Sequence, residues 1–154
     1  RSIQVTEGNV RAFESRAALP SSSKGWYLDL PVSGERIVQD AQLAGRFLVT
    51  ASIIPSGGAC SSSGTGYINA LDAFTGTSGS LSYFDLNGDG VTEDTAVTGG
   101  LPVGSVNLGN GMPTLPNLLR GLLGVGGSGG AGLNTVRTAA PRWDRASWRE
   151  IRRD

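Results

Sequence analysis

The sequence predicts an all-β protein built from short strands that are joined by long loops. Glycine occupies 24 of the 154 positions, and glycine favours turns over the interiors of helices and strands. Segments in which apolar and polar residues alternate recur about every ten residues. No segment shows the apolar spacing of an amphipathic helix. Short strands at this spacing are typical of a β-sandwich or a β-propeller.

The chain has few apolar residues for an independent domain. Apolar residues make up 38% of the chain and charged residues only 17%. A chain of this length can bury a substantial core, so we interpret the shortage of apolar residues as a sign that the remainder of a larger domain completes the core. The chain opens at Arg1 without a leader or a transmembrane run, which favours a processed piece of a longer protein.

Charge and residue usage exclude several classes of function. The formal net charge is zero, so no global positive field exists to hold a nucleic acid or an anionic membrane. Histidine is absent, which removes Ser-His-Asp and Cys-His catalytic sites and the commonest zinc ligand. The single cysteine, Cys60, cannot form an internal disulfide. The sequence therefore predicts a protein without catalytic machinery of its own.

The N-terminal third predicts one hairpin, one loop and one short strand. Alternation over residues 2–13 is interrupted at Gly8-Asn9, which indicates a hairpin. Residues 17–24 contain a proline and three serines and are predicted to be a loop. Residues 25–30 place Trp26, Leu28 and Leu30 on one face, so we expect a strand that ends before the proline at position 31.

The middle third predicts the longest strands. Residues 36–43 and 46–54 flank a turn at Ala44-Gly45, and the second segment is apolar enough to be covered on both faces. Residues 56–66 form a loop of small residues. A strand over residues 67–72 and a turn over residues 73–77 follow.

The C-terminal part is predicted to be irregular. Prolines and glycines break residues 101–123, so no regular helix is expected there. Residues 121–132 are expected to be a glycine-rich, mobile loop. Residues 133–138 and 146–151 are candidate closing strands, with Trp143 and Trp148 as packing anchors.

One motif carries chemistry. Residues 85–94, DLNGDGVTED, match the D-x-[DN]-x-[DN]-G start of an EF-hand-type calcium loop. Oxygens at the first, third, fifth and seventh positions of such a loop converge on the cation, and the glycine at the sixth position allows the sharp bend. The candidate ligands are Asp85, Asn87, Asp89, the carbonyl of Val91, and Glu93 or its competitor Asp94.

The motif departs from an EF-hand in two ways. The twelfth position, where the bidentate glutamate belongs, is Ala96, and no helix pattern flanks the loop. We therefore expect a calcium loop between strands, with an affinity in the micromolar to millimolar range. Four acids within ten residues repel one another unless a cation is bound. The alternative is a surface turn rich in Asp, Asn and Gly that binds no metal.

Other patterns that suggest sites are weaker. Gly124, Gly126 and Gly129 satisfy G-x-G-x-x-G, but the run follows no clear strand and opens no helix, so a flexible linker is the better interpretation. The carboxylates of Asp29, Asp40 and Asp72 are isolated near strand ends. For Trp26, Tyr27 and Tyr67, core packing is a better interpretation than ligand stacking.

Several segments resemble the C-terminal propeller of type IV pilus tip adhesins of the PilY/PilC type. The most specific is residues 25–31, GWYLDLP, followed by residues 34–38, GERIV. Further similar segments follow at family-like spacing: residues 54–56, Cys60, residues 66–73, Thr75-Gly76, residues 84–90 and residues 147–150. Residues 70–72 with Thr75-Gly76 are also similar to the blade signature of quinoprotein-like propellers. The resemblance implies that residues 1–154 are the last blades of a quinoprotein-like β-propeller, with long loops and an inserted calcium loop, and that residues 36–85 form one complete blade.

The resemblance implies a function as well as a fold. Members of this family are secreted across the periplasm and outer membrane and sit at the tip of the pilus on minor pilins. They support pilus biogenesis, oppose retraction when calcium is bound, and contribute to twitching motility and to attachment to host or abiotic surfaces. Carried over to this sequence, the calcium ligands are Asp85, Asn87, Asp89, Val91 and Glu93. The rest of the propeller is then missing from this chain.

Two alternatives to a calcium-responsive adhesion module remain. One is a degenerate quinoprotein-type enzyme fragment in which calcium holds a redox cofactor. The other is a β-domain in which calcium is a purely structural brace.

Overall fold

The computed structural model describes residues 1–13, 18–57, 63–96, 98–119, 121–129 and 134–138. These residues form strands, turns and irregular loops, and none of them is helical. The prediction of an all-β fold is therefore confirmed for the described residues. No helix long and apolar enough to cross a membrane occurs in this part of the chain.

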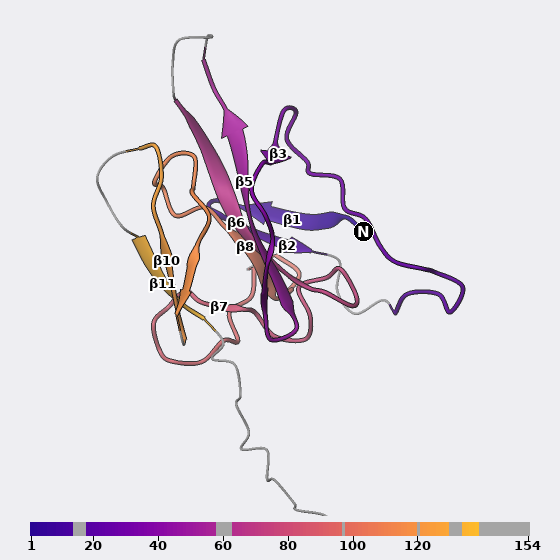
Figure 1. The fold of residues 1–154 in the computed structure, drawn as a ribbon. Helices are drawn as coiled ribbons and strands as arrows, with labels where there is room; N and C mark the ends of the chain where they lie inside the picture. The colour runs from indigo at the N-terminus through magenta and orange to yellow at the C-terminus, as the bar shows by residue number, and fades with distance from the viewer. Residues whose placement is uncertain (14–17, 58–62, 97, 120, 130–133, 139–154) are drawn as a thin grey trace, which may run out of the picture.

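Two antiparallel sheets make up the fold (Figure 1). The larger sheet has seven strands in the order β1-β2-β8-β6-β5-β3, and β4 also pairs with β5. Its strands are β1 (Ile3–Glu7), β2 (Val10–Phe13), β3 (Arg36–Ile37), β4 (Gln42–Ala44), β5 (Phe47–Pro55), β6 (Gly64–Asp72) and β8 (Val103–Val106). The smaller sheet has the order β7-β11-β10-β9. Its strands are β7 (Phe84–Asp85), β9 (Asn117–Leu119), β10 (Leu122–Val125) and β11 (Asn134–Thr138).

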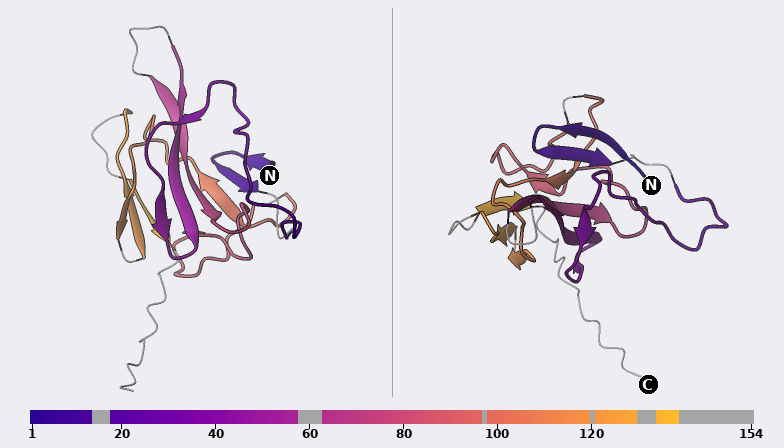
Figure 2. Two further views of the ribbon diagram at one scale, coloured as in Figure 1. Left: turned by 45° about the vertical axis from the view of Figure 1, so that its right-hand side comes forward. Right: turned by 90° about the horizontal axis from the view of Figure 1, so that it is seen from above.

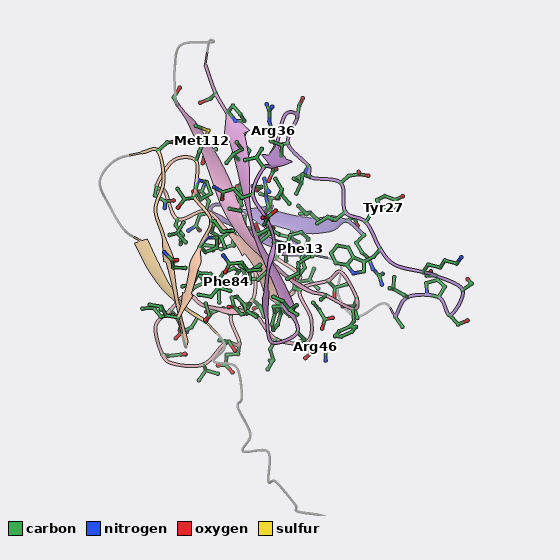
Figure 3. The ribbon with its side chains drawn as sticks, viewed as in Figure 1. Phe13, Tyr27, Arg36, Arg46, Phe84 and Met112 are labelled. Carbon is green, nitrogen blue, oxygen red and sulfur yellow. The ribbon has the colours of Figure 1, made fainter. Side chains whose placement is uncertain are left out.

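The hydrophobic core lies between the two sheets. Val49 and Ala51 of β5 and Ile68 and Ala70 of β6 are buried on the face of the larger sheet that meets Phe84, Leu123 and Val125 of the smaller sheet. The two sheets stand side by side in both views of Figure 2, and Figure 3 shows the Phe84 side chain inside the molecule. The core is thus built from residues that are far apart in sequence.

Both predicted hairpins are confirmed. Strands β1 and β2 pair around Gly8, which has a φ of +54°, a left-handed conformation that glycine adopts without steric cost. Strands β4 and β5 pair across Gly45, and the centre of β5 is buried on both faces as its apolar sequence predicts. The segment before that turn is split, however, into β3 and β4, because extra residues bulge out between Ile37, opposite Ser52, and Gln42, opposite Val49.

Three predictions about strands were wrong. Residues 25–30 form no strand, although Trp26, Leu28 and Leu30 do share one half-buried face. Within the expected loop over residues 121–132, Leu122–Val125 form β10, whose Leu123 and Val125 are fully buried. Residues 36–85 do not form a separate blade, because β7 pairs with β11 in the other sheet while β8, β2 and β1 extend the sheet of β5 and β6. Both sheets are open in the described residues, so the propeller stays a prediction.

Candidate metal centre

Strand β7 fixes the start of the acidic loop. Phe84 is fully buried in the core, and its ring stands edge-on to Tyr83 at a centroid distance of 5.4 Å. The strand pairs with β11 through Phe84 opposite Thr138 and Asp85 opposite Arg137. Asp85 follows the buried Phe84 directly, and its own exposure is only 4%. The first predicted ligand is therefore held at the edge of the sheet by the burial of its neighbour.

The carboxylate of Asp85 organises the bend that follows it. Its Oδ1 accepts a hydrogen bond from the backbone N–H of Gly88 at 2.7 Å, and its Oδ2 accepts one from Gly90 at 2.9 Å. Gly88 and Gly90 have φ values of +78° and +90°, a region in which residues with a Cβ are strained. This sharp bend at Gly90 is the conformation that the sixth position of a calcium loop requires.

The next two predicted ligands, Asn87 and Asp89, form hydrogen bonds with each other on the exposed side of the loop. The Oδ1 of Asn87 accepts the N–H of Asp89 at 3.0 Å, and the Nδ2 of Asn87 donates to Asp89 Oδ2 at 2.9 Å. The N–H of Val91 donates to Asp89 Oδ1 at 2.8 Å. The side chains at the third and fifth positions are thus ordered within the loop, and the direct contact between Asn87 and Asp89 occupies one of the oxygens that a metal would use.

Asp94 closes the loop, whereas Glu93 does not. The Oδ2 of Asp94 accepts the N–H of Leu86 at 2.9 Å, which brings its carboxylate back to the first turn. The carbonyl of Asp94 also accepts the N–H of Val103 at 3.2 Å and thereby connects the loop to β8. Glu93 is exposed. Between the two candidates for the last ligand, the geometry favours Asp94.

The loop supplies the type of ligand that a hard cation prefers, but its side chains are not gathered around one point. All the candidate ligands are oxygens, the ligand type that calcium prefers, and none of the four acids forms an ion pair with a described Arg or Lys. However, no three acidic or cysteine side chains come together within the described residues as a group that could hold a metal. Coordination would require the contact between Asn87 and Asp89 to open.

The isolated carboxylates do not form a second site. Asp29 and Asp40 are exposed, whereas Asp72 is buried at the end of β6. The Oδ1 of Asp72 accepts the N–H groups of Phe74 and Thr75 at 2.9 and 3.1 Å. Its Oδ2 lies 2.5 Å from Arg46 Nε. Asp72 therefore holds the turn that follows β6, which confirms the turn predicted over residues 73–77.

The environment of Asp72 makes part of the stability dependent on pH. Burial raises the pKa of Asp72, but the hydrogen bonds from Arg46, Phe74 and Thr75 outweigh it and leave the pKa below the usual 3.8. A carboxyl whose pKa is lower in the folded state stabilises the fold at neutral pH and loses this contribution as the pH falls through the folded pKa. We expect the free energy of unfolding to fall on acidification below about pH 4.

Denaturant unfolding at a series of pH values tests this expectation. Asp72→Asn, which keeps an acceptor at the turn, should reduce the fall in the free energy of unfolding below about pH 4. The control Asp29→Asn, at an exposed position, should not. An unchanged fall in Asp72→Asn would show that other groups cause the pH dependence.

A buried ion pair that the sequence did not predict lies beside the larger sheet. Arg11 of β2 and Glu35 meet through two hydrogen bonds, Nη1 to Oε1 at 2.8 Å and Nη2 to Oε2 at 3.1 Å, and their side chains are 1% and 0% exposed. Ser52 Oγ donates to Glu35 Oε1 at 2.6 Å, and the guanidinium lies 3.5 Å from the ring centroid of Tyr67. Arg11 occupies a polar position of an alternating strand, a pattern that normally indicates exposure to solvent.

The remaining predictions about single residues have mixed outcomes. Tyr67 is buried and Trp26 half-buried, as core packing predicts, but Tyr27 is 75% exposed and points away from the sheets in Figure 3. Gly124 lies inside β10, so a linker was the wrong interpretation for that glycine. The predictions for Cys60, Trp143 and Trp148 lie outside the described residues, as does the strand expected over residues 146–151.

Comparison with known proteins gives similar sequences from type IV pilus systems. The chain is 31% identical over 160 aligned positions to the type IV pilus biogenesis factor PilY1 homolog of Xylella fastidiosa, an alignment that covers 97% of this chain and 13% of that protein. It is 30% identical over 77 positions to PilY1 of two Pseudomonas aeruginosa strains, which covers 47% of this chain and 7% of each relative. No protein-family model and no solved structure matches.

Proposed function

This chain is homologous to the type IV pilus biogenesis factors of the PilY1 type, and we propose that it is a non-enzymatic, calcium-binding module of such a factor. The chain spans 13% of the length of the Xylella relative. We propose that it contributes one part of the activity of a larger protein of this type. We further propose that this larger protein acts at the pilus tip, on minor pilins and on the surfaces to which the pilus attaches.

The acidic loop is the observation that supports calcium binding. Asp85 is fixed by β7 and by the bend at Gly90, and Asp94 returns to the same turn through Leu86. Asn87 and Asp89 lie on the exposed side between them. In the proposed site Asp85, Asn87, Asp89, the carbonyl of Val91 and Asp94 hold the ion, while Glu93 stays in solvent or binds through water.

A bound calcium ion would supply the positive charge that offsets the repulsion among the four acids. The chain itself connects this loop to both sheets. Asp85 belongs to β7 of the smaller sheet, and the Asp94 carbonyl bonds to Val103 at the start of β8 in the larger sheet. Ordering the loop therefore joins the two sheets more firmly, and this is the physical route by which calcium would regulate a neighbouring pilus surface.

Exchange of the loop acids in the parent protein tests the proposed function. In a bacterium that carries the full-length protein, Asp85→Ala with Asp89→Ala should alter the number of surface pili and the twitching distance relative to wild type. Asp29→Ala with Asp40→Ala, which removes two exposed acids outside the loop, is the matched control. Piliation and twitching that are unchanged in the loop variant, at equal protein levels, would refute a regulatory role.

A purely structural calcium is the second candidate, because the first ligand is itself buried next to the core residue Phe84. It makes a different prediction for the same variant. The isolated chain would lose thermal stability on chelation, while the full-length protein would keep normal twitching. The two measurements together therefore distinguish a structural calcium ion from a regulatory one.

A further inference from the structure

The second face of the larger sheet carries a cavity next to a segment that forms no strand. Residues 25–31 cross this face without pairing to any strand. The segment is held at one end by Trp26, whose Nε1 donates to the carbonyl of Ala73 at 2.9 Å and whose ring lies against Gly76. Further along the chain, Glu35 holds it through Arg11 and Ser52. Between these anchors, the carbonyl of Tyr27 accepts a hydrogen bond from the N-terminal ammonium group of Arg1 at 2.8 Å, and the described structure shows no ladder pairing of residues 28–31 with a strand.

A cavity of about 240 Å³ lies beneath this segment. Its apolar lining comes from both the segment and the sheet. The lining residues are Trp26, Leu28, Leu30, Ile37, Leu48, Thr50, Asn69 and Leu71. None of them is charged, and a cavity of about 150 Å³ with an apolar lining already accepts a molecule the size of benzene. The space is therefore suited to a small uncharged molecule or group.

One polar side chain of the lining has a buried atom without a partner. Asn69 is 2% exposed, and its Oδ1 accepts a hydrogen bond from Ser105 Oγ at 2.7 Å. Its Nδ2 is buried and has no hydrogen-bond partner among the described residues. A buried donor without an acceptor costs free energy, so a ligand that brings an acceptor to this position gains more than the same ligand without one.

We propose that this cavity is a binding site for a small, uncharged, mainly apolar molecule that carries a single hydrogen-bond acceptor such as a carbonyl. The apolar side chains remove the body of the ligand from water, and the Nδ2 of Asn69 donates to its acceptor. The site is distinct from the acidic loop, which contributes no residue to its lining.

The access route follows from the way the segment is attached. Ile37 is 45% exposed at the edge of the cavity. Leu28 and Leu30 line the cavity, and among the described residues neither forms a backbone hydrogen bond to a strand, so their side chains can move without breaking a ladder. Because the Nδ2 of Asn69 is itself buried, its contact with a ligand requires a shift of neighbouring lining side chains, and the anchors at Trp26 and Glu35 can stay in place.

Titration of the whole chain with a matched pair of probes tests the site. Acetophenone carries a carbonyl, and isopropylbenzene has nearly the same shape without an acceptor. In amide NMR spectra, both should shift the backbone signals of Asn69 and Leu71 saturably, and acetophenone alone should shift the side-chain amide of Asn69. In Asn69→Leu, the Kd of acetophenone divided by the Kd of isopropylbenzene should rise about tenfold.

Cavity-filling variants keep the test decisive if Asn69→Leu does not fold. Leu30→Phe should abolish binding of both probes, whereas Leu43→Phe, at an exposed position outside the lining, should leave both unchanged. Absence of saturable shifts at the solubility limit of the probes would overturn the proposal. An equal Kd ratio in wild type and Asn69→Leu would overturn the role of the amide.

Discussion

Glu35→Gln is expected to lower the free energy of unfolding by about 3–5 kcal/mol, the cost of breaking a buried ion pair by removing one partner. Both side chains of the pair with Arg11 are shielded from solvent. The variant leaves the guanidinium buried without a countercharge, and the contact with the Tyr67 ring at 3.5 Å offsets only part of that cost. The pair also anchors the segment that covers the second sheet face, so its loss should release that segment.

Urea unfolding measures this effect, and two variants serve as controls. Arg46→Gln breaks the pair with Asp72, in which Arg46 is 62% and Asp72 5% exposed. The Asp72 carboxylate keeps its hydrogen bonds from Phe74 and Thr75, so the cost should stay below about 1 kcal/mol. Arg11→Met combined with Glu35→Leu removes both charges and should recover most of the stability lost in Glu35→Gln. A loss below about 1 kcal/mol in Glu35→Gln would contradict the account of a desolvated charge pair.

Calcium is expected to raise the melting temperature of the chain by roughly 5–10 °C at a concentration one hundred times its Kd. A ligand that binds only the folded state stabilises it by about 2.7 kcal/mol at this ratio, and a domain of this size gains about 2–4 °C per kcal/mol. The gain should be lost in Asp85→Ala with Asp89→Ala, because these carboxylates supply the first and fifth ligands of the proposed site.

Differential scanning calorimetry with and without a chelator checks the calcium effect. Asp29→Ala with Asp40→Ala is again the matched control, since it removes the same number of charges from exposed positions outside the loop. Magnesium at the same concentration should produce a smaller shift, because it requires stricter octahedral geometry and gives up its waters reluctantly. An equal gain in the loop variant would place the stabilising ion elsewhere.

The fold was predictable from sequence where strand pairing is local. The turns at Gly8 and Gly45 have the residues that tight hairpins need, and the apolar run of β5 indicates burial on both faces. Residues 25–30 were misjudged because alternation reports which side chains face the core and not whether the backbone pairs. Strand β10 was missed because Gly124 lies within a glycine-rich run, although Leu123 and Val125 pack in the core.

The acidic loop and the ion pair show two different limits of prediction from sequence. The spacing of Asp85, Asp89 and Gly90 is local, so the bend could be anticipated. The spacing left the last ligand of the proposed site open, and the return of Asp94 to Leu86 is the tertiary contact that favours Asp94 over Glu93 in that proposal. Arg11 and Glu35 are 24 residues apart, and only the tertiary fold brings them together. The conformations of Glu35 and of Asn69 near the cavity likewise depend on packing between distant strands.

Isothermal titration of the wild-type chain with calcium, alongside Asp85→Ala with Asp89→Ala, is the most direct test of the central claim that residues 85–94 hold a calcium ion. The account predicts one saturable site in wild type, with a Kd in the micromolar to millimolar range, and only heat of dilution in the variant. Identical heats from the two proteins would contradict it.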